Sequence, residues 1–411
     1  MATSISSTAL DFQSIKNNLK NFLASKSEFA DYNFEASGLS NILDVLAYNT
    51  HYNGLIANFA TNESYLGTAQ LRSSIVSLAE ALGYIPGSVN SSEATVNISL
   101  DLSSVTNRPN LLSLPSNTKF LSRVNDSTYT FQTLGALIAY DDGNGLYNFV
   151  DLSDSSDVNI FEGTLKTKRF IVAPYADNTV YVIPDTTLNS STITVQVYES
   201  RASTNYVEYT NILGATDVTD SSRYYYMKES PNGFYEISFG NGKTLGSIPT
   251  AGNVIVVTYL ASVGDECNGA TVFTPLNTIT VNDQNYNLIV STVAPSAGGS
   301  AKEDIESIRK NAPFQFASQN RMVTAGDYTS VIYRNFPTMI KDIRAYGGQD
   351  ATNPKFGTIY ISIVFNDNIS EATINRTKTE ILYLVEKLAI ASFVVEFVEP
   401  QLTYIECKTF F

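Results

Sequence analysis

Histidine is the residue whose scarcity most limits the chemistry open to this chain. His51 is the only histidine among 411 residues. This excludes most metal sites built from histidines and leaves one candidate base for a Ser-His-Asp triad. His51 stands beside Tyr52 in a segment of helical periodicity, which favours a packing or surface role. We therefore assign no catalytic residue and expect a protein that is not an enzyme.

One short glycine-containing stretch resembles part of a nucleotide-binding loop. Gly242-Lys243-Thr244 matches the end of the phosphate-binding P-loop, but that pattern requires a glycine where Ile237 stands. The surrounding sequence is typical of a β-hairpin, so no helix is expected to follow and direct its N-terminus at a phosphate. The pattern therefore does not predict a nucleotide cofactor, or any other.

Acidic loops supply the oxygen ligands that calcium prefers. The stretch Asp141-Asp142-Gly143-Asn144-Gly145 resembles part of a calcium loop but lacks the downstream glutamate of an EF-hand. A second group, Asp151, Asp154 and Asp157, has the right ligand type but lies in a serine-rich loop. We interpret both as solvated turns and predict no metal site.

The charge balance bears on the partners of this chain. Forty acidic and 26 basic residues give a net charge of -14, whereas proteins that bind nucleic acid normally present a basic surface. No nucleic acid partner is expected. Only 16% of residues are charged, and tyrosine and phenylalanine number 25 and 22. Neutral and aromatic groups are cheaper to desolvate than charges, which suits extensive protein contact, although strand preferences alone would give the same composition.

The cysteines and the terminal segments indicate the compartment. Cys267 and Cys407 are too few and too far apart to suggest a zinc site or a disulfide framework, so we expect reduced thiols in a cytoplasm. Residues 1–10 lack the features of a signal peptide. No apolar run approaches the ~18–20 residues that span a membrane, and no membrane partner is expected.

Residues 1–90 have helical periodicity. The first segment carries a narrow apolar stripe, formed by Phe12, Ile15, Leu19, Phe22 and Leu23. A second segment, Leu39 to Phe59, is apolar on more than one face, and a third opens near Asn62 and ends at Gly83 and Pro86. Either the three helices close a small bundle, or their stripes pack against partner chains. The narrow first stripe favours a partner interface, because a coiled-coil seam is narrow.

From about residue 91 to 297 apolar residues recur at every second position, as in a β-strand. Val96, Ile98 and Leu100 alternate with polar residues, as do Val195 and Val197 further on. Turn clusters rich in Asn, Asp, Gly and Pro separate such runs, which predicts an antiparallel β-rich domain.

Residues 298–411 mix the two periods and predict a mixed α/β region. Ser300 with Glu303, and Thr324 with Asp327, have the spacing of helix capping boxes, and Pro313 is expected to end the first helix. Further on, a strand over 358–365, a helix capped by Ser370 and a strand over 393–397 form one β-α-β unit. The whole chain is thus predicted to be a multidomain α+β protein with domains at 1–90, 91–297 and 298–411.

The stretch from Gly298 to Tyr328 also carries a family resemblance. Its sequence resembles the signature of the phage baseplate J-like family, and within it the baseplate wedge proteins of T-even-like contractile-tailed phages. Residues 238–259 resemble a second motif of this family, and NFLASKSEFADYNFEASGL is similar to its N-terminal part. The matching signature positions are Gly298, Gly299, Glu303, Asp304, Arg309, Pro313, Arg321, Asp327 and Tyr328.

The resemblance implies a structural function. Such wedge proteins pair with themselves and with other wedge subunits, form a ring around a central hub, and rearrange when the sheath contracts. A virion protein of the tail baseplate, made in the host cytoplasm, is therefore expected. Family members usually continue further, so we expect the C-terminal region to be incomplete. The alternative is a tail-associated glycan or cell-wall hydrolase, whose carboxylate pair cannot be defined from spacing. We expect Gly298–Tyr328 to fix the junction between the β-rich and C-terminal regions.

Overall fold

The computed structural model describes residues 11–400 except 30, 35–36, 152–156, 175–178, 214, 216–217, 319–320, 337, 352–353, 367–368 and 390–392. The described residues form two compact units. One contains the chain up to Ile85 together with Ile305–Pro313, and the other contains Pro86–Asp304 together with the chain from Phe314 onward. The expected order of a helical segment, an antiparallel β-rich middle and a mixed C-terminal region is confirmed. The three domain boundaries stay a prediction.

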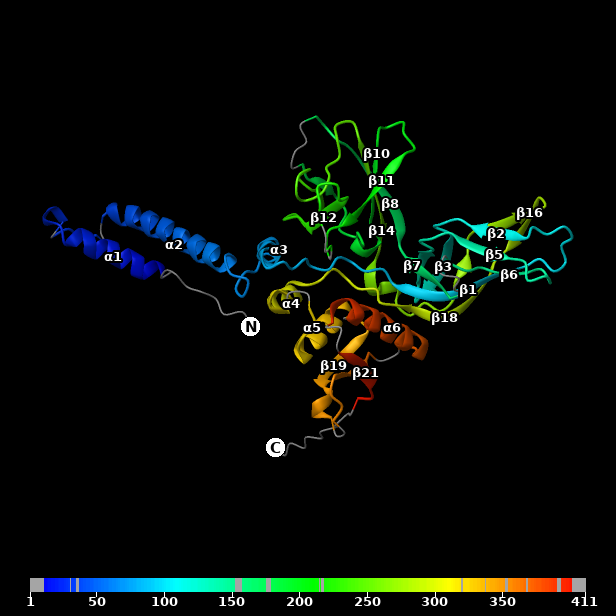
Figure 1. Ribbon diagram of the computed structural model, residues 1–411. Helices are drawn as coiled ribbons and strands as arrows, with labels where there is room; N and C mark the ends of the chain where they lie inside the picture. Colours follow the sequence, from blue (N-terminus) through cyan, green and yellow to red (C-terminus); the bar gives the residue numbers. More distant parts are fainter. Residues whose placement is uncertain are drawn as a thin grey trace. The chain divides into compact units, whose positions relative to one another are not determined.

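The N-terminal helices are α1 (Phe12–Ala24), α2 (Leu39–Glu63) and α3 (Arg72–Ala81). Asp11 begins α1, because its carboxylate accepts a hydrogen bond from the Ser14 amide at 2.7 Å. The first two helices lie side by side (Figure 1). The prediction that the third helix opens near Asn62 is wrong: α2 continues to Glu63, whose carboxylate accepts the Gln70 amide and so closes the turn before α3.

The start of α4 (Ile305–Ser318) completes the core of the helical unit. Ile308 and Ala312 are fully buried in one cluster with Ile75 and Ala79 of α3. Because α3 finds its apolar partner more than 200 residues away in sequence, this cluster is not a bundle of three consecutive helices.

The second unit contains two seven-stranded sheets with separate cores. The first has the order β15-β3-β4-β7-β1-β18, with β6 also paired to β1. Its strands are β1 (Glu93–Asp101), β3 (Lys119–Val124), β4 (Ser127–Gln132), β6 (Leu146–Asn148), β7 (Val158–Glu162), β15 (Thr274–Pro275) and β18 (Ile289–Ala297). Two hairpins accompany it: β2 (Leu111–Leu114) with β5 (Leu137–Tyr140), and β16 (Thr278–Val281) with β17 (Gln284–Asn287). The predicted alternation is confirmed, since Val96, Ile98 and Leu100 are all buried in the first core.

The second sheet has the order β8-β14-β10-β11-β12-β13-β9. Its strands are β8 (Thr164–Ile171), β9 (Tyr181–Ile183), β10 (Thr194–Tyr198), β11 (Tyr206–Asn211), β12 (Tyr224–Glu229), β13 (Tyr235–Phe239) and β14 (Val254–Ala261). All pairs are antiparallel except β11 with β12. The predicted strand residues Val195 and Val197 are buried in its core.

The C-terminal region contains α5 (Ala325–Asn335), β19 (Ile340–Gly347), β20 (Thr358–Phe365), α6 (Glu371–Leu388) and β21 (Val394–Val398). The parallel pairing of β20 and β21 across α6 confirms the β-α-β unit. Ser370 begins α6, because its hydroxyl accepts the Thr373 amide at 3.2 Å.

Candidate assembly surface and junction

The predicted interface stripe lies on α1, which packs along α2. Phe12, Ile15, Leu19 and Leu23 are half-buried, whereas Phe22 is 60% exposed. An ion pair between Lys16 and Asp44 links the two helices. The packing of α1 against α2 thus accounts for the partial burial of four of the five stripe residues. Phe22 remains exposed to solvent within the described residues. The role of the stripe as a partner interface stays a prediction.

A larger apolar surface lies on α2. Only Leu43, Ala47 and Asn58 of this helix are buried. Its exposed large apolar side chains, the α2 face, are Ile42, Val45, Leu46, Tyr48, Tyr52, Leu55, Ile56 and Phe59. The sequence carries a signal for this surface, because the segment is apolar on more than one face, whereas the predicted interface stripe lies on α1. A helix that is apolar on several faces is normally buried on several faces.

Gly298 and Gly299 are held tightly at the end of β18. Gly298 has a φ of +82°, which an L-residue rarely adopts. A Cβ on Gly299 would lie within 3.0 Å of the Gly264 carbonyl oxygen and the Ser92 hydroxyl. The Gly299 amide donates to Asn268 Oδ1 and its carbonyl accepts from Asn268 Nδ2, both at 3.0 Å. This close fit explains why two glycines stand here.

A buried acid, Glu162, lies near the residues that pack against Gly299. Glu162 is 4% exposed, and its carboxylate accepts hydrogen bonds from the Ser262 hydroxyl at 2.6 Å and the Val263 amide at 3.3 Å. Burial raises the pKa of Glu162 above its ordinary value, although both hydrogen bonds act in the opposite direction. Burial likewise raises the pKa of the neighbouring Cys267 thiol to about 12, so this cysteine is an inert core residue.

The residues after Gly299 are extended and do not begin a helix. The Ser300 backbone exchanges two hydrogen bonds with Asn90, and Glu303 accepts the Gly87 amide at 2.9 Å. The predicted capping box of Ser300 and Glu303 is therefore wrong, because both residues are engaged by a segment more than 200 residues earlier. Helix α4 begins only at Ile305.

Lys302 fixes the same extended segment to the second sheet. Its ammonium lies 3.0 Å from the Glu229 carboxylate, whose side chain is 2% exposed, and donates to the Gly233 carbonyl at 2.8 Å. It also lies 4.9 Å from the centre of the Tyr235 ring. A buried carboxylate needs such a partner, because losing it leaves an uncompensated charge.

Arg309 makes its contacts within the helical unit. Its Nε donates to the Leu66 carbonyl at 3.0 Å and its Nη2 to the Ala69 carbonyl at 2.6 Å. The planar guanidinium is suited to two such contacts at once. The signature from Gly298 to Pro313 is therefore divided: its first part is bound by the β-rich unit and its second part by the helical unit.

Pro313 lies inside α4 and does not end it. The helix continues to Ser318, so the prediction of a helix stop at this proline is wrong. The bias of a pre-proline residue against the α region is a preference, and here Ala312 is fixed in helical geometry by its burial against α3. The missing N–H of Pro313 removes one hydrogen bond from the helix interior.

The second predicted capping box is confirmed at the start of α5. Thr324 accepts the Asp327 amide at 3.3 Å, and the Asp327 carboxylate accepts the Thr324 amide at 2.8 Å. Tyr328 is fully buried in the C-terminal core. Arg321 is exposed between α4 and α5. The proposed junction role of Asp304, Arg321 and the other signature residues stays a prediction.

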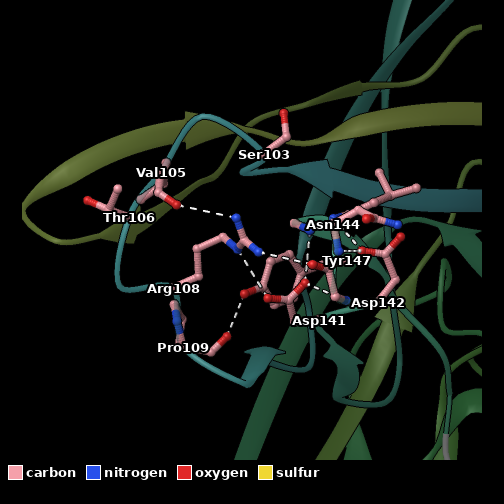
Figure 2. Close-up of polar contacts among 12 residues, drawn as sticks. Ser103, Val105, Thr106, Arg108, Pro109, Asp141, Asp142, Asn144 and Tyr147 are labelled. Atoms are coloured by element: carbon pink, nitrogen blue, oxygen red, sulfur yellow. Dashed lines mark hydrogen bonds and ion pairs between the residues drawn. The ribbon is translucent and has the colours of Figure 1, made fainter.

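Figure 2 shows how the candidate calcium loop is built. Asp141 accepts Arg108 Nε at 3.1 Å and the amides of Gly143 and Gly145, and Asp142 accepts the amides of Asn144 and Leu146. Partial burial acts to raise the pKa of Asp141, but the Arg108 and amide hydrogen bonds outweigh it and lower that pKa. These carboxylate oxygens hold the turn and its flanking arginine, and the interpretation as a turn without a metal stays a prediction.

The other candidates for chemistry are His51, the P-loop-like stretch at residues 242–244 and the second acidic group. His51 is half-buried on α2. Asn241 Oδ1 accepts the amides of Lys243 and Thr244, so both amides already have a hydrogen-bond partner within the turn. Asp154 lies outside the described residues. Within the described ranges, no three or more His, Cys, Asp or Glu side chains are placed to hold a metal. No helix in the same ranges is long and apolar enough to cross a membrane.

Two segments of the chain match models of known domains. Residues 11–84 match the helical domain of gp6-like baseplate wedge proteins, and residues 324–397 match C-terminal domain I of the baseplate structural protein gp6. Both matches support a relationship to baseplate wedge proteins. The baseplate wedge protein gp6 of Enterobacteria phage T4 is 31% identical over 370 residues, which are 85% of this chain and 53% of gp6. The chain thus spans about half the length of this curated relative.

Two solved structures are also similar. A chain of the anti-feeding prophage baseplate aligns with 12% identity and a TM-score of 0.34, covering 97% of this chain and 81% of that one. A chain of the type VI secretion system TssK-TssF-TssG baseplate subcomplex aligns with 8% identity and a TM-score of 0.37, covering 88% and 96%.

Proposed function

We propose that this chain is a structural subunit of the baseplate wedge of a phage contractile tail. It forms a dimer within the wedge, joins other wedge subunits in the ring around the central hub, and rearranges when the sheath contracts. Its place is the tail baseplate of the virion, after synthesis in the host cytoplasm. The two matched domains and the similarity to gp6 of phage T4 support this role, and Gly298–Tyr328 supports membership of the baseplate J-like family.

The α2 face is the observation that carries the proposal. Eight large apolar side chains are exposed on one helix within the segment that matches the gp6-like helical domain. A contiguous apolar surface of this kind marks a protein interaction site. Covering it would gain on the order of 10 kcal/mol before the entropic cost of association, at ~1.5–3 kcal/mol for each fully buried side chain. We infer that another polypeptide covers it in the assembled wedge.

The role is proposed to be assembly without catalysis. The only histidine lies on α2. The carboxylates of Asp141 and Asp142 and the amides of Lys243 and Thr244 form hydrogen bonds within their own turns. The comparisons give no support to the alternative of a glycan or cell-wall hydrolase. Turnover of peptidoglycan or polysaccharide by the purified chain, abolished by one carboxylate substitution, would reverse this conclusion.

The assembly proposal is tested by placing a charge on the α2 face. Val45 and Ile56 are 68% and 60% exposed, so Val45→Asp and Ile56→Asp should leave the isolated chain folded. An unpaired carboxylate buried in an interface is costly. We therefore expect at least about tenfold weaker self-association by light scattering, and a similar loss in co-purification with wedge subunits of the same tail.

The matched control is Leu213→Asp. Leu213 is also exposed, at 54%, but lies in the β-rich unit, so the same change should leave association unaltered. Circular dichroism should show unchanged helix content in all three variants. Wild-type association in Val45→Asp and Ile56→Asp would rule out the α2 face as an interface.

A further inference from the structure

A cavity of about 310 Å³ lies beside β8, β14 and the hairpin that joins β10 to β11. Its polar lining includes Arg169, Arg201, Tyr198, Ser200 and Ser203. Val254 and Val256 of β14 also line it. The volume is at the lower end of the range for small-ligand pockets, which restricts the site to one compact group.

Strand register explains how these residues share one face. Arg169 is paired with Val256, and Tyr198 with Val254. Directly opposite residues of an antiparallel pair lie on the same face of the sheet. The intervening residues Ile255 and Val257 point to the second core. Val254 and Val256 are nonetheless only 6% and 7% exposed, so the side chains around the cavity shield an aliphatic floor.

The two arginines are the unusual feature of the cavity. Both are exposed, and neither side chain makes an ion pair or hydrogen bond to any residue that the structure describes. Lys166 on the same strand, by contrast, pairs with Asp185 at 2.7 Å. The Glu199 carboxylate accepts the hydroxyl of the lining residue Ser203 at 3.4 Å and pairs with neither arginine. In a chain with a net charge of -14, two guanidinium groups at one cavity without a carboxylate partner among the described residues are suited to an anion from another molecule.

We propose that this cavity binds a carboxylate side chain presented by an acidic segment of another polypeptide. The planar guanidinium groups of Arg169 and Arg201 match the two oxygens of a carboxylate. The valine floor contacts the aliphatic stem behind that carboxylate, a contact that a free phosphate cannot make. The inference rests on the proposed assembly function, because it names one contact that such a subunit makes.

The test is calorimetric titration of the full chain with a hexaglutamate peptide, alongside a hexaglutamine peptide and inorganic phosphate. Hexaglutamate should bind, hexaglutamine should not, and phosphate should bind more weakly. Arg169→Ala with Arg201→Ala should weaken hexaglutamate binding about tenfold or more, the effect of losing one charge-assisted contact. Arg169→Lys with Arg201→Lys keeps both charges but loses the planar forks, so an intermediate loss is expected.

Lys168→Ala is the matched control. It removes the same charge one residue away, and its pairing with Val257 places it on the opposite face of β8. The affinity of the Lys168→Ala variant for hexaglutamate should remain within about twofold of that of the wild type. Absent hexaglutamate binding, equal binding by all variants, or stronger binding of phosphate would each overturn the inference. Ile56→Asp should leave hexaglutamate binding unchanged, so failure of the assembly proposal is seen separately.

Discussion

Replacing Gly299 by alanine tests whether close packing around this glycine fixes the chain after the end of β18. The backbone of Gly299 has no positive φ, so an alanine is not strained by its dihedral angles. The added methyl group instead meets the Gly264 carbonyl and the Ser92 hydroxyl. Moving the chain away from them breaks the two hydrogen bonds between Gly299 and Asn268.

The expected cost follows from these contacts. Two hydrogen bonds contribute about 1 kcal/mol each, and overpacking adds about 1–3 kcal/mol. Gly299→Ala should therefore lower the unfolding free energy by about 3–5 kcal/mol and the Tm of the β-rich unit by roughly 4–8 °C. Differential scanning calorimetry measures both, and limited proteolysis should show new cleavage near residues 298–304.

Gly135→Ala provides the comparison for this experiment. Gly135 has no atom within 4 Å of an added Cβ and no positive φ, so its Tm should stay within about 2 °C of wild type. A Gly299→Ala variant as stable as Gly135→Ala, with an unchanged digestion pattern, would refute the argument that close packing requires a glycine here.

Two other substitutions test the arginine and the buried acid of this region. Arg309→Lys loses the paired contacts to the Leu66 and Ala69 carbonyls and should lower the unfolding free energy by about 1–3 kcal/mol, which faster proteolysis at residues 64–71 would report. Lys310→Ala changes an exposed neighbour and should leave both stability and proteolysis unchanged. Equal effects of the two substitutions would contradict the role of Arg309 in holding this turn. Because burial raises the pKa of Glu162 above its ordinary value of 4.5, the stability that its protonated form contributes is complete below that pH and is lost as the pH rises through the folded-state pKa. Glu162→Gln keeps an acceptor without the charge, so urea unfolding should show it more stable than wild type at pH 7, by a difference that shrinks towards pH 4; a difference independent of pH would exclude this explanation.

Local patterns predicted those elements whose stabilising contacts are also local. The strand over residues 358–365 and the cap at Ser370 match the structure because alternation and capping depend on neighbours in sequence. The capping box of Thr324 and Asp327 is correct for the same reason. The box at Ser300 and Glu303 has the same spacing but is absent, since Asn90 and Gly87 bind those residues instead. Nothing within the local pattern reveals such a distant competitor.

Pro313 illustrates the same limit from the other side. A proline in a helix interior costs about 3 kcal/mol or more relative to an ordinary residue, and on local grounds the helix should stop before it. Burial of Ile308 and Ala312 against α3 offsets that cost. The partner helix lies far away in sequence, so the outcome could not be read from the residues around the proline.

The candidate interface shows what an apolar pattern specifies and what it leaves open. The residues of α1 and α2 show which side chains avoid water, but each pattern fits burial within the chain as well as burial under a partner. The structure separates the two cases: α1 partly covers its own stripe against α2, while Ile56 and Val45 remain exposed. A narrow stripe is satisfied by one neighbouring helix, whereas a helix that is apolar on several faces needs more than one. On this argument α2, more than α1, is the helix that we propose another chain covers.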